Sequence, residues 1–260
     1  MRGFALALAF AGCLTGPATG ADVALVASTG QAPFADPEWP REGLATEILQ
    51  EALGQSPDTP QHDLIWQDRE SAYPELLAGA GVDIGFPWIG ADCNGAGAVT
   101  PVCRRFHFSD PLAEVAVLLF TTTAGEFLFR NASDLDGRTL CRPARHYVTG
   151  SSDAAPFSVV EAETPAACFA LLTAGDVDAV AIDEFTGVRQ LFVLDLTETV
   201  VPLPQPLETQ TLHAVISRTH WRGTTHLYRV NAGLARLRET GRYAEILDRH
   251  LTLYWEEVAR

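Results

Sequence analysis

The feature that most constrains the fold is a regular alternation of short apolar strands with amphipathic helices near the N-terminus. Val23–Ala27 predicts a buried strand, and Leu44–Leu53 predicts a helix with its leucine and isoleucine side chains on one face. The strand Leu64–Trp66, a helix from Ser71 to Gly79 and the strand Val82–Phe86 follow. This β-α-β-α-β order with short connections indicates a parallel sheet with helices on its faces.

The same alternation restarts after the apolar strand Val115–Thr121. Arg138–Cys141 predicts another strand, Thr164 is placed to cap a helix that ends at Gly175, and Val177–Ile182 predicts the next strand. A second α/β unit with its own strand-loop-helix order therefore begins near the middle of the chain.

The last part of the chain returns toward the first unit. A proline-rich crossing segment at residues 202–206 leads to the strand Leu212–Ile216 and to helices between Thr224 and Tyr254, interrupted at Gly241. The chain thus has two α/β units, with one segment that crosses from the first to the second and another that crosses back. This arrangement predicts two lobes joined by a double hinge. Each lobe is expected to be a mixed, mostly parallel sheet flanked by helices. The predicted boundaries are residues 22–120 with 208–260 for lobe 1 and residues 121–207 for lobe 2.

The N-terminus has the pattern of a secretory signal peptide over residues 1–21. Arg2 precedes an apolar run from Phe4 to Leu14 that is too short for a permanent membrane anchor, and small residues follow up to Ala21. A lipoprotein attached at Cys13 is the alternative, but a better cleavage site lies downstream. The sequence therefore favours export of a soluble protein to the periplasm.

Four cysteines remain once the signal peptide is removed: Cys93, Cys103, Cys141 and Cys168. An even number in an exported chain suggests two disulfides, for which three connectivities exist. Proximity in the sequence favours Cys93–Cys103 and Cys141–Cys168. Zinc is the competing interpretation, but there is no CxxC and no histidine at ligand spacing beside any of the four.

The charge of the chain excludes several classes of function. The net charge of −15 argues against binding to nucleic acid or to anionic membranes. All 18 basic side chains are arginines, so a Schiff-base lysine, a P-loop lysine and a Ser-Lys dyad are excluded. Arginine is also the side chain best suited to bidentate recognition of an anion.

The stretch Asp83–Leu112 combines the features of a ligand-binding edge. Its strand is predicted to break at Pro87-Trp88, and a glycine-rich loop then runs between Cys93 and Cys103. Ligands of α/β proteins usually bind where strands end in such loops.

The chain resembles the family 3 extracellular solute-binding proteins, the type II periplasmic binding proteins that serve polar amino-acid transporters. Several motifs of that family occur in order along the mature chain. Within the family, the chain is most similar to an uncharacterised cysteine-containing subgroup, because of its cysteines and the segment Leu140–Pro143. The matching segments are Ala32–Phe34 with Gly43, Leu77–Ile84, Phe108–Leu112, Asp134–Arg138, Gly175–Val180 with Asp183, and Asn231–Ile246.

The resemblance implies a monomeric periplasmic receptor that captures a small polar ligand, an amino acid or a related metabolite, between its lobes. It would deliver that ligand to an ABC permease in the inner membrane, without a cofactor or a metal. Two alternatives stay open: an accessory binding protein of a periplasmic redox or signalling system, and an enzyme similar to cyclohexadienyl dehydratase. Because the only candidate acid/base pair is Asp183-Glu184, whose members are adjacent and generally point apart, binding without catalysis is expected.

Six side chains are the candidates for ligand contact. The aromatic residues would stack on the ligand, the arginines would bind an anionic group, and the aspartate matches the family's acid for the ligand's amino group. Each also has a structural interpretation: core packing, a solvated charge, an ion pair or a helix cap. The candidates are Phe34, Trp88, Arg104, Arg142, Tyr147 and Asp183.

The sequence departs from the family at the arginine that clamps the ligand carboxylate. That arginine follows a threonine in the pattern T-x-x-R, but Thr100 is followed three residues later by Cys103, and Arg104 is offset by one position. Either the disulfide rebuilds this loop or the clamp is absent, so the sequence does not name the ligand.

Overall fold

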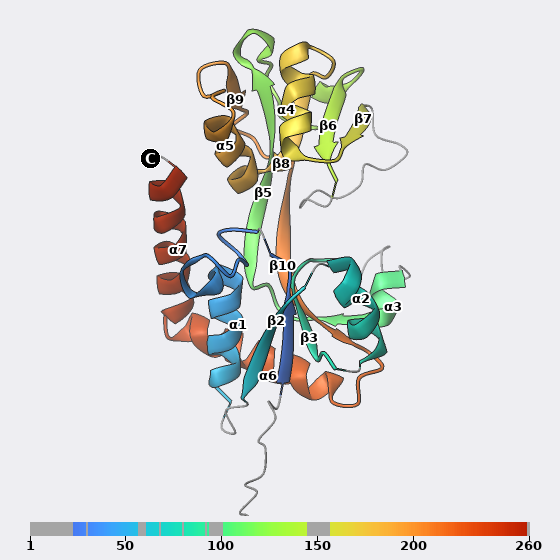
Figure 1. Ribbon diagram of the computed structural model, residues 1–260, viewed down its shortest axis with the longest axis vertical. Coiled ribbons are helices and arrows are strands. Elements are labelled where there is room, and N and C mark those ends of the chain that lie inside the picture. The colour runs from blue at the N-terminus through green and yellow to red at the C-terminus, as the bar shows by residue number, and fades with distance from the viewer. Residues whose placement is uncertain are drawn as a thin grey trace, which may run out of the picture.

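The computed structural model describes residues 23–29, 31–56, 61–67, 69–79, 81–91, 93, 101–144 and 157–258. The predicted signal peptide with Cys13, and the candidate Tyr147, lie outside these residues. Two groups of elements, joined by the long strands β5 and β10, form an elongated molecule (Figure 1). We call the lower group in this view lobe 1 and the upper group lobe 2.

Lobe 1 is built on the predicted parallel sheet. β1 pairs in parallel with β2 on one side and with β3 on the other, and helices flank the sheet (Figure 1). Its elements are β1 Val23–Ala27, α1 Leu44–Gly54, β2 His62–Trp66, α2 Arg69–Ala78, β3 Ile84–Ile89, α3 Pro101–Arg105, β4 Phe106–Phe108, α6 Gly223–Glu239 and α7 Arg242–Val258.

Two strands of ten residues connect the lobes. β5 (Ala113–Thr122) and β10 (Glu208–Ser217) are antiparallel neighbours between Ala113 and Val117 of β5. Beyond Val117, β5 continues into lobe 2, where it pairs with β8. In the described part of the chain, ten strands therefore form one continuous sheet that passes through both lobes.

Lobe 2 places its parallel strands on the far side of β5. β8 pairs antiparallel with β5 and parallel with β6, which in turn pairs parallel with β7. The predicted restart of the α/β pattern is thus observed. Its elements are β6 Thr139–Pro143, β7 Ser158–Ala162, α4 Pro165–Ala174, β8 Ala179–Asp183, α5 Glu184–Val193 and β9 Val200–Pro202.

The predicted break of the third strand at Pro87-Trp88 is wrong, because β3 continues through both residues to Ile89. Trp88 and Ile89 pair antiparallel with β10, and the register of β10 shifts between His213 and Val215, beside the proline. Proline has no N–H to donate to a strand ladder, and a bulge in the partner strand accommodates this gap.

Local end signals were read correctly at several helices. The Thr164 hydroxyl accepts a hydrogen bond from the Ala167 N–H at the start of α4, and Gly175 ends this helix in the left-handed conformation. Gly241, at φ 78°, separates α6 from α7 as expected. Helix α5 was not predicted; it begins directly after β8.

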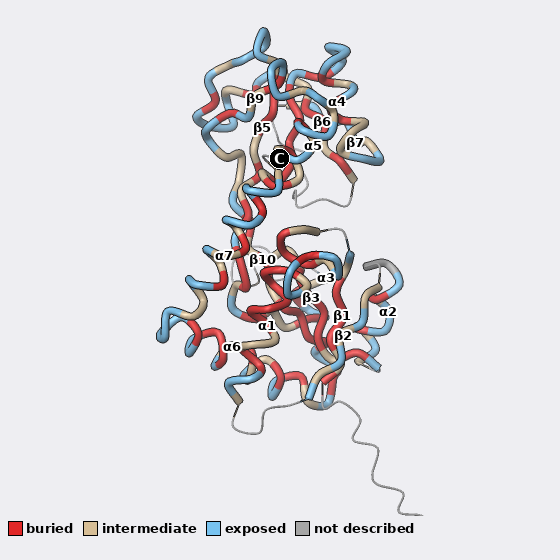
Figure 2. Tube along the Cα trace, turned by 60° about the vertical axis from the view of Figure 1, so that its left-hand side comes forward, coloured by how far each residue is buried: buried red, intermediate tan, exposed pale blue. Residues whose placement is uncertain are grey.

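The helices of lobe 1 pack tightly over its core. A Cβ atom at Gly233 in α6 would lie 2.0 Å from the backbone oxygen of Ala52 in α1, so only glycine permits this approach. Buried residues line the inner sides of α1, α6 and the central strands (Figure 2). Among the helices of the described residues, none is long and apolar enough to cross a membrane.

Candidate functional site

The topology points the carboxyl ends of the parallel strands of both lobes at each other. β1 and β3 run in the same direction as β5, because β3 and β5 are both antiparallel to β10. β8 and β6 run in the opposite direction, because β8 is antiparallel to β5. In open α/β sheets ligands bind outside the carboxyl ends of the strands, so these facing edges define the candidate site.

Val117 marks the point at which β5 leaves lobe 1. It lies opposite Glu208 of β10 on one side and opposite Asp183 of β8 on the other. The neighbouring Ala116 N–H donates a 3.5 Å hydrogen bond to Glu184. Two acidic residues from lobe 2 and one from β10 therefore gather at the connection between the lobes.

Asp183 ends β8 and begins α5. Its side chain is 1% exposed, and Oδ1 accepts a hydrogen bond of 2.8 Å from the Thr186 N–H. This is the N-cap alternative raised by the sequence, and it holds the carboxylate at the candidate edge. A carboxylate can accept several hydrogen bonds, so the cap does not exclude a ligand contact.

Glu184 is the second acid of this pair. Burial raises the pKa of its carboxyl above the ordinary value; the Ala116 N–H opposes this shift and the charge of Asp183 adds to it. A partly buried acid beside a second carboxylate is a common setting for binding a cation, since a bound positive charge would relieve the repulsion between them.

The structure places Phe34 inside the core of lobe 1 at 1% exposure. Its ring packs edge-on to Phe185 of α5, with centroids 5.1 Å apart. Phe185 also contacts Tyr254 and Trp255 of α7, and the Tyr254 hydroxyl donates to its carbonyl oxygen. Phe34 therefore helps join lobe 2 to lobe 1, a role that the sequence analysis did not consider.

Trp88 is half-buried within a different aromatic group. Its ring lies 6.0 Å from that of Tyr73 and 5.8 Å from that of Phe106. A small hollow of about 10 Å³ opens beside it, lined by the ends of β1 and β3 with Ser28 and Gln67. This hollow holds at most about one water molecule, so it is too small for a metabolite.

The candidate arginines occupy different environments. Arg104 is exposed on the short helix α3, and its neighbour Arg105 contacts the Tyr73 hydroxyl at 3.4 Å. Arg142, near the end of β6, forms an ion pair with Glu161 of β7. The pairing with an acid, which the sequence left open for Arg142, is thus present.

The cysteines are bonded as proximity in the sequence favours. Cys93–Cys103 attaches the segment after β3 to α3, and Cys141–Cys168 connects β6 to α4. Cys141 and Cys168 are fully buried in a lobe 2 core cluster. Both bridges therefore fix segments that border the candidate edge.

A further set of polar side chains lies on the connecting strand β10 and was missed by the sequence analysis. Gln210 is 5% exposed and donates to Glu208 at 2.8 Å, while its Oε1 contacts no donor among the described residues. His213 lies between the Ser109 carbonyl and the Thr211 hydroxyl. Burial lowers the pKa of His213, which favours its neutral form. The available signal was the run of four polar residues with which this strand begins, Glu208–Thr211.

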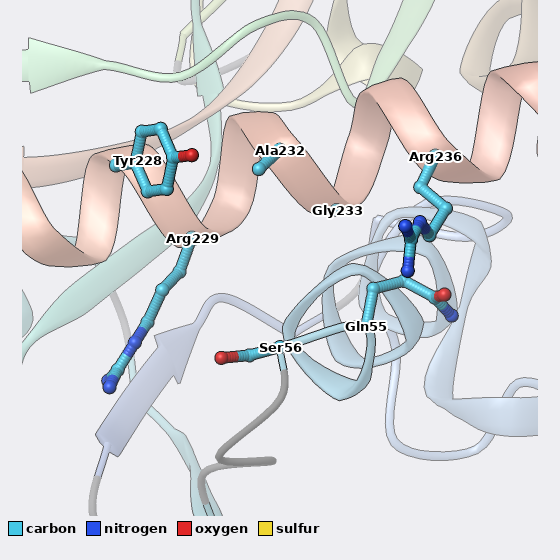
Figure 3. A pocket seen from close by; sticks show the side chains of 7 residues that line it. All are labelled: Gln55, Ser56, Tyr228, Arg229, Ala232, Gly233 and Arg236. Atoms are coloured by element: carbon cyan, nitrogen blue, oxygen red, sulfur yellow. The ribbon is translucent and has the colours of Figure 1, made fainter.

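A larger pocket of about 480 Å³ lies away from the candidate edge, at the end of lobe 1 farthest from lobe 2. Arg236 extends from α6 toward Gln55 at the end of α1, whereas Arg229 extends from the same helix to the other side of the pocket (Figure 3). All of its lining residues belong to lobe 1. Its size alone does not make this pocket the better candidate for the ligand site, because closure of the two lobes would leave the shape of the pocket unchanged.

Comparison with solved structures identifies the fold. The GluR0 ligand-binding core in complex with L-glutamate matches with a TM-score of 0.66 at 16% identity, covering 91% of this chain and all of that one. A mutant of ArgBP from T. maritima matches at 0.63 and 18%, covering 88% and 95%. AbpA from Streptococcus pneumoniae, an amino acid ABC transporter substrate-binding protein bound to L-arginine, matches at 0.62 and 13%, covering 89% and 95%.

These structural similarities confirm the predicted two-lobed fold of the type II periplasmic binding proteins. No family model matches the sequence, and no curated protein matches it. At such low identities the similarity establishes the fold alone, and the function has to be argued from the site.

Proposed function

We propose that this protein is a periplasmic solute-binding receptor that captures a small polar ligand, an amino acid or a related metabolite, between its two lobes. The proposal rests on one observation. The carboxyl ends of the parallel strands of the two lobes face each other, and acidic side chains lie where β5 passes between the lobes. Bound ligand would shift the population toward a closed arrangement of the lobes. The solved proteins of similar fold named above include one bound to L-glutamate and one bound to L-arginine.

The acidic side chains favour a ligand that carries a positive group. Asp183 sits at the carboxyl end of β8, Glu184 follows it at the start of α5, and Glu208 of β10 lies across β5 from Asp183. A buried carboxylate forms a charge-assisted hydrogen bond with an ammonium group, which contributes about 1.5–3 kcal/mol. We assign the ligand's amino group to Asp183, with Arg142 as the candidate for an anionic group.

A thermal-shift screen of ligand-stripped, refolded protein tests the function. Amino acids, polyamines, sugars and organic acids are compared. A ligand at one hundred times its dissociation constant should stabilise the protein by about 2.7 kcal/mol. If no compound of these classes raises the melting temperature, the proposal of a metabolite receptor fails.

The variant Asp183→Asn tests the site without removing the helix cap, because asparagine is also a good N-cap residue. We expect a loss of affinity of about tenfold to a hundredfold, measured by calorimetry with the ligand that the screen identifies. Asp248→Asn, on the exposed side of α7, is the matched control and should bind normally. Unchanged affinity in Asp183→Asn would remove this residue from the site.

The role of Arg142 can be separated from its ion pair by a second pair of variants. If its guanidinium binds the ligand, Arg142→Gln weakens binding, whereas Glu161→Gln leaves the arginine in place and does not. Equal effects of both substitutions would assign Arg142 to the ion pair alone.

Delivery to an ABC permease in the inner membrane, by a monomeric receptor, completes the proposal. Adjacent permease and ATPase genes, and loss of ligand uptake when this gene is deleted, are the expected findings. Normal uptake in the deletion strain would favour the accessory binding protein instead. Turnover of a candidate acid by the purified protein would favour the dehydratase-like enzyme.

A further inference from the structure

Three metal-ligating side chains meet at the end of lobe 1 that is remote from the candidate ligand site. Asp83 immediately precedes β3, His220 lies in the turn after β10, and His226 is in the first turns of α6. One possible ligand atom from each lies within 4.8 Å of the others. Asp83 is at the amino end of a parallel strand, whereas the ligand edge is at the carboxyl ends.

His226 is the least satisfied member of this cluster. It is fully buried, and neither ring nitrogen has a hydrogen-bond partner among the described residues. Its Nε2 lies 3.8 Å from Oδ1 of Asp83, so the ring is directed into the cluster. Leaving a buried polar group unsatisfied costs about 1–3 kcal/mol, and native structures usually resolve such a cost with a bound ion or water.

The carboxylate of Asp83 is oriented by the backbone. Its Oδ2 accepts a 2.6 Å hydrogen bond from the Ala24 N–H, which leaves Oδ1 facing both histidines. Metal-ligating carboxylates are typically held by an outer hydrogen bond of this kind.

We propose that Asp83, His220 and His226 form a binding site for a divalent transition metal of the zinc class, with water completing the coordination. Two imidazole nitrogens and one carboxylate oxygen are a donor set that zinc and its neighbours in the first transition row accept. In a tetrahedral zinc site with bonds of about 2.0–2.2 Å, ligand atoms lie about 3.3–3.6 Å apart. The present separations differ from these by less than about 1.5 Å, which side-chain rotation supplies.

Two features of the surroundings set the expected behaviour of this site. His220 Nδ1 accepts the Arg222 N–H, which places the ring proton on Nε2, 2.8 Å from Asp83. A metal at Nε2 requires that proton to move to Nδ1, with loss of the Arg222 hydrogen bond. The positive charges of Arg222 and Arg229 also act on His226 and oppose a cation. The affinity for the metal is therefore expected to be moderate.

A bound metal would connect three segments that are distant in the sequence. It would fasten the start of β3, the turn after β10 and the beginning of α6 to one another. This site therefore acts on the stability of lobe 1 and is independent of the proposed ligand.

Titration of the untagged, chelator-treated protein with Co²⁺ tests the inference. We expect one Co²⁺ per chain, with the visible absorption bands of tetrahedral coordination, and displacement of Co²⁺ by Zn²⁺. His226→Gln should weaken uptake by at least about tenfold, whereas His62→Gln, on the partly exposed strand β2, should not.

Circular dichroism establishes that each variant is folded. Should His226→Gln fail to fold, Asp83→Asn provides the second test, since its amide oxygen can still accept from Ala24. Absence of Co²⁺ and Zn²⁺ binding by the folded wild-type protein overturns the proposal. Undiminished uptake by either folded variant does so as well.

Discussion

The two lobes reach stability by different means. Lobe 1 has one large core cluster, in which the helices α1, α6 and α7 pack against its sheet, and a smaller cluster around Leu76 and Phe106. Lobe 2 has two smaller clusters on opposite faces of its sheet, since neighbouring residues such as Ala181 and Ile182 belong to different clusters. A disulfide lies inside one of these clusters, whereas the disulfide of lobe 1 lies at its edge.

This difference follows from the scaling of surface with volume. A smaller unit buries a smaller fraction of its apolar surface and gains more from covalent cross-links. Lobe 1 instead combines its core with a buried polar network. There the Trp39 indole N–H donates to His250, and His250 contacts Glu47 at 2.8 Å.

Phe185 is the exception to the division between the lobes. It belongs to α5 of lobe 2 but is part of the core cluster of lobe 1. We predict that Phe185→Ala lowers the free energy of unfolding by about 3–5 kcal/mol and makes the two lobes unfold separately in calorimetry. Phe192→Ala, on the same helix but 48% exposed, is the control and should cost less than about 1 kcal/mol. Similar losses in both variants would contradict an inter-lobe role for Phe185.

The two disulfides allow the lobes to be compared directly. Cys141–Cys168 spans 27 residues and Cys93–Cys103 spans 10. From loop entropy, replacing both cysteines of the longer bridge by alanine should cost about 3–4 kcal/mol, about 1 kcal/mol more than the same change at the shorter one. Guanidinium unfolding of the two double variants measures this difference. A larger loss from the Cys93–Cys103 pair would mean that the edge bridge carries more of the stability.

The polar network of lobe 1 predicts a smaller, pH-dependent effect. Burial opposes the charge of Glu47, but hydrogen bonds from His250 and Arg249 outweigh it, so the pKa of Glu47 lies below its ordinary value. Burial also lowers the pKa of His250, despite its hydrogen bond to Glu47. On acidification the unfolded chain therefore binds more protons than the folded one. For His250 this difference sets in below its ordinary pKa of about 6.5, and for Glu47 below its ordinary pKa of about 4.5.

Stability should accordingly be highest above pH 6.5 and should fall on acidification. Denaturant unfolding at pH 7, 5.5 and 4 measures this trend. His250→Gln should be less stable at pH 7 but should lose less stability between pH 7 and 5.5 than the wild type does. An equal pH dependence in the variant would show that other groups are responsible.

Much of the secondary structure could be predicted from the sequence, because local patterns record it. The strand Val23–Ala27 has the predicted bounds, and the ends of α4 follow from Thr164 and Gly175. Where a tertiary partner overrides a local signal, prediction failed. β3 passes through Pro87 because its partner β10 shifts register there.

The candidate site was predicted less completely. The sequence placed Asp183 at a strand end, which is where it lies, and offered a helix cap as the alternative to ligand contact; the structure shows that the carboxylate caps α5. Phe34 was expected to face a ligand, whereas its ring packs against Phe185. Gln210 lies in a run of polar residues, but its importance depends on which strands meet at β10, which no local pattern shows.

The sequence by itself determined the order of strands and helices, the helix ends and the proximity of the cysteine pairs. These depend on hydrogen-bond periodicity and on short loops, which neighbouring residues specify. Only the tertiary structure decided that the strand ends of the lobes face each other, that Phe185 enters the core of lobe 1, and that Asp83 meets His220 and His226. Such contacts depend on strand register and helix packing, which are fixed when distant segments bury their surfaces together.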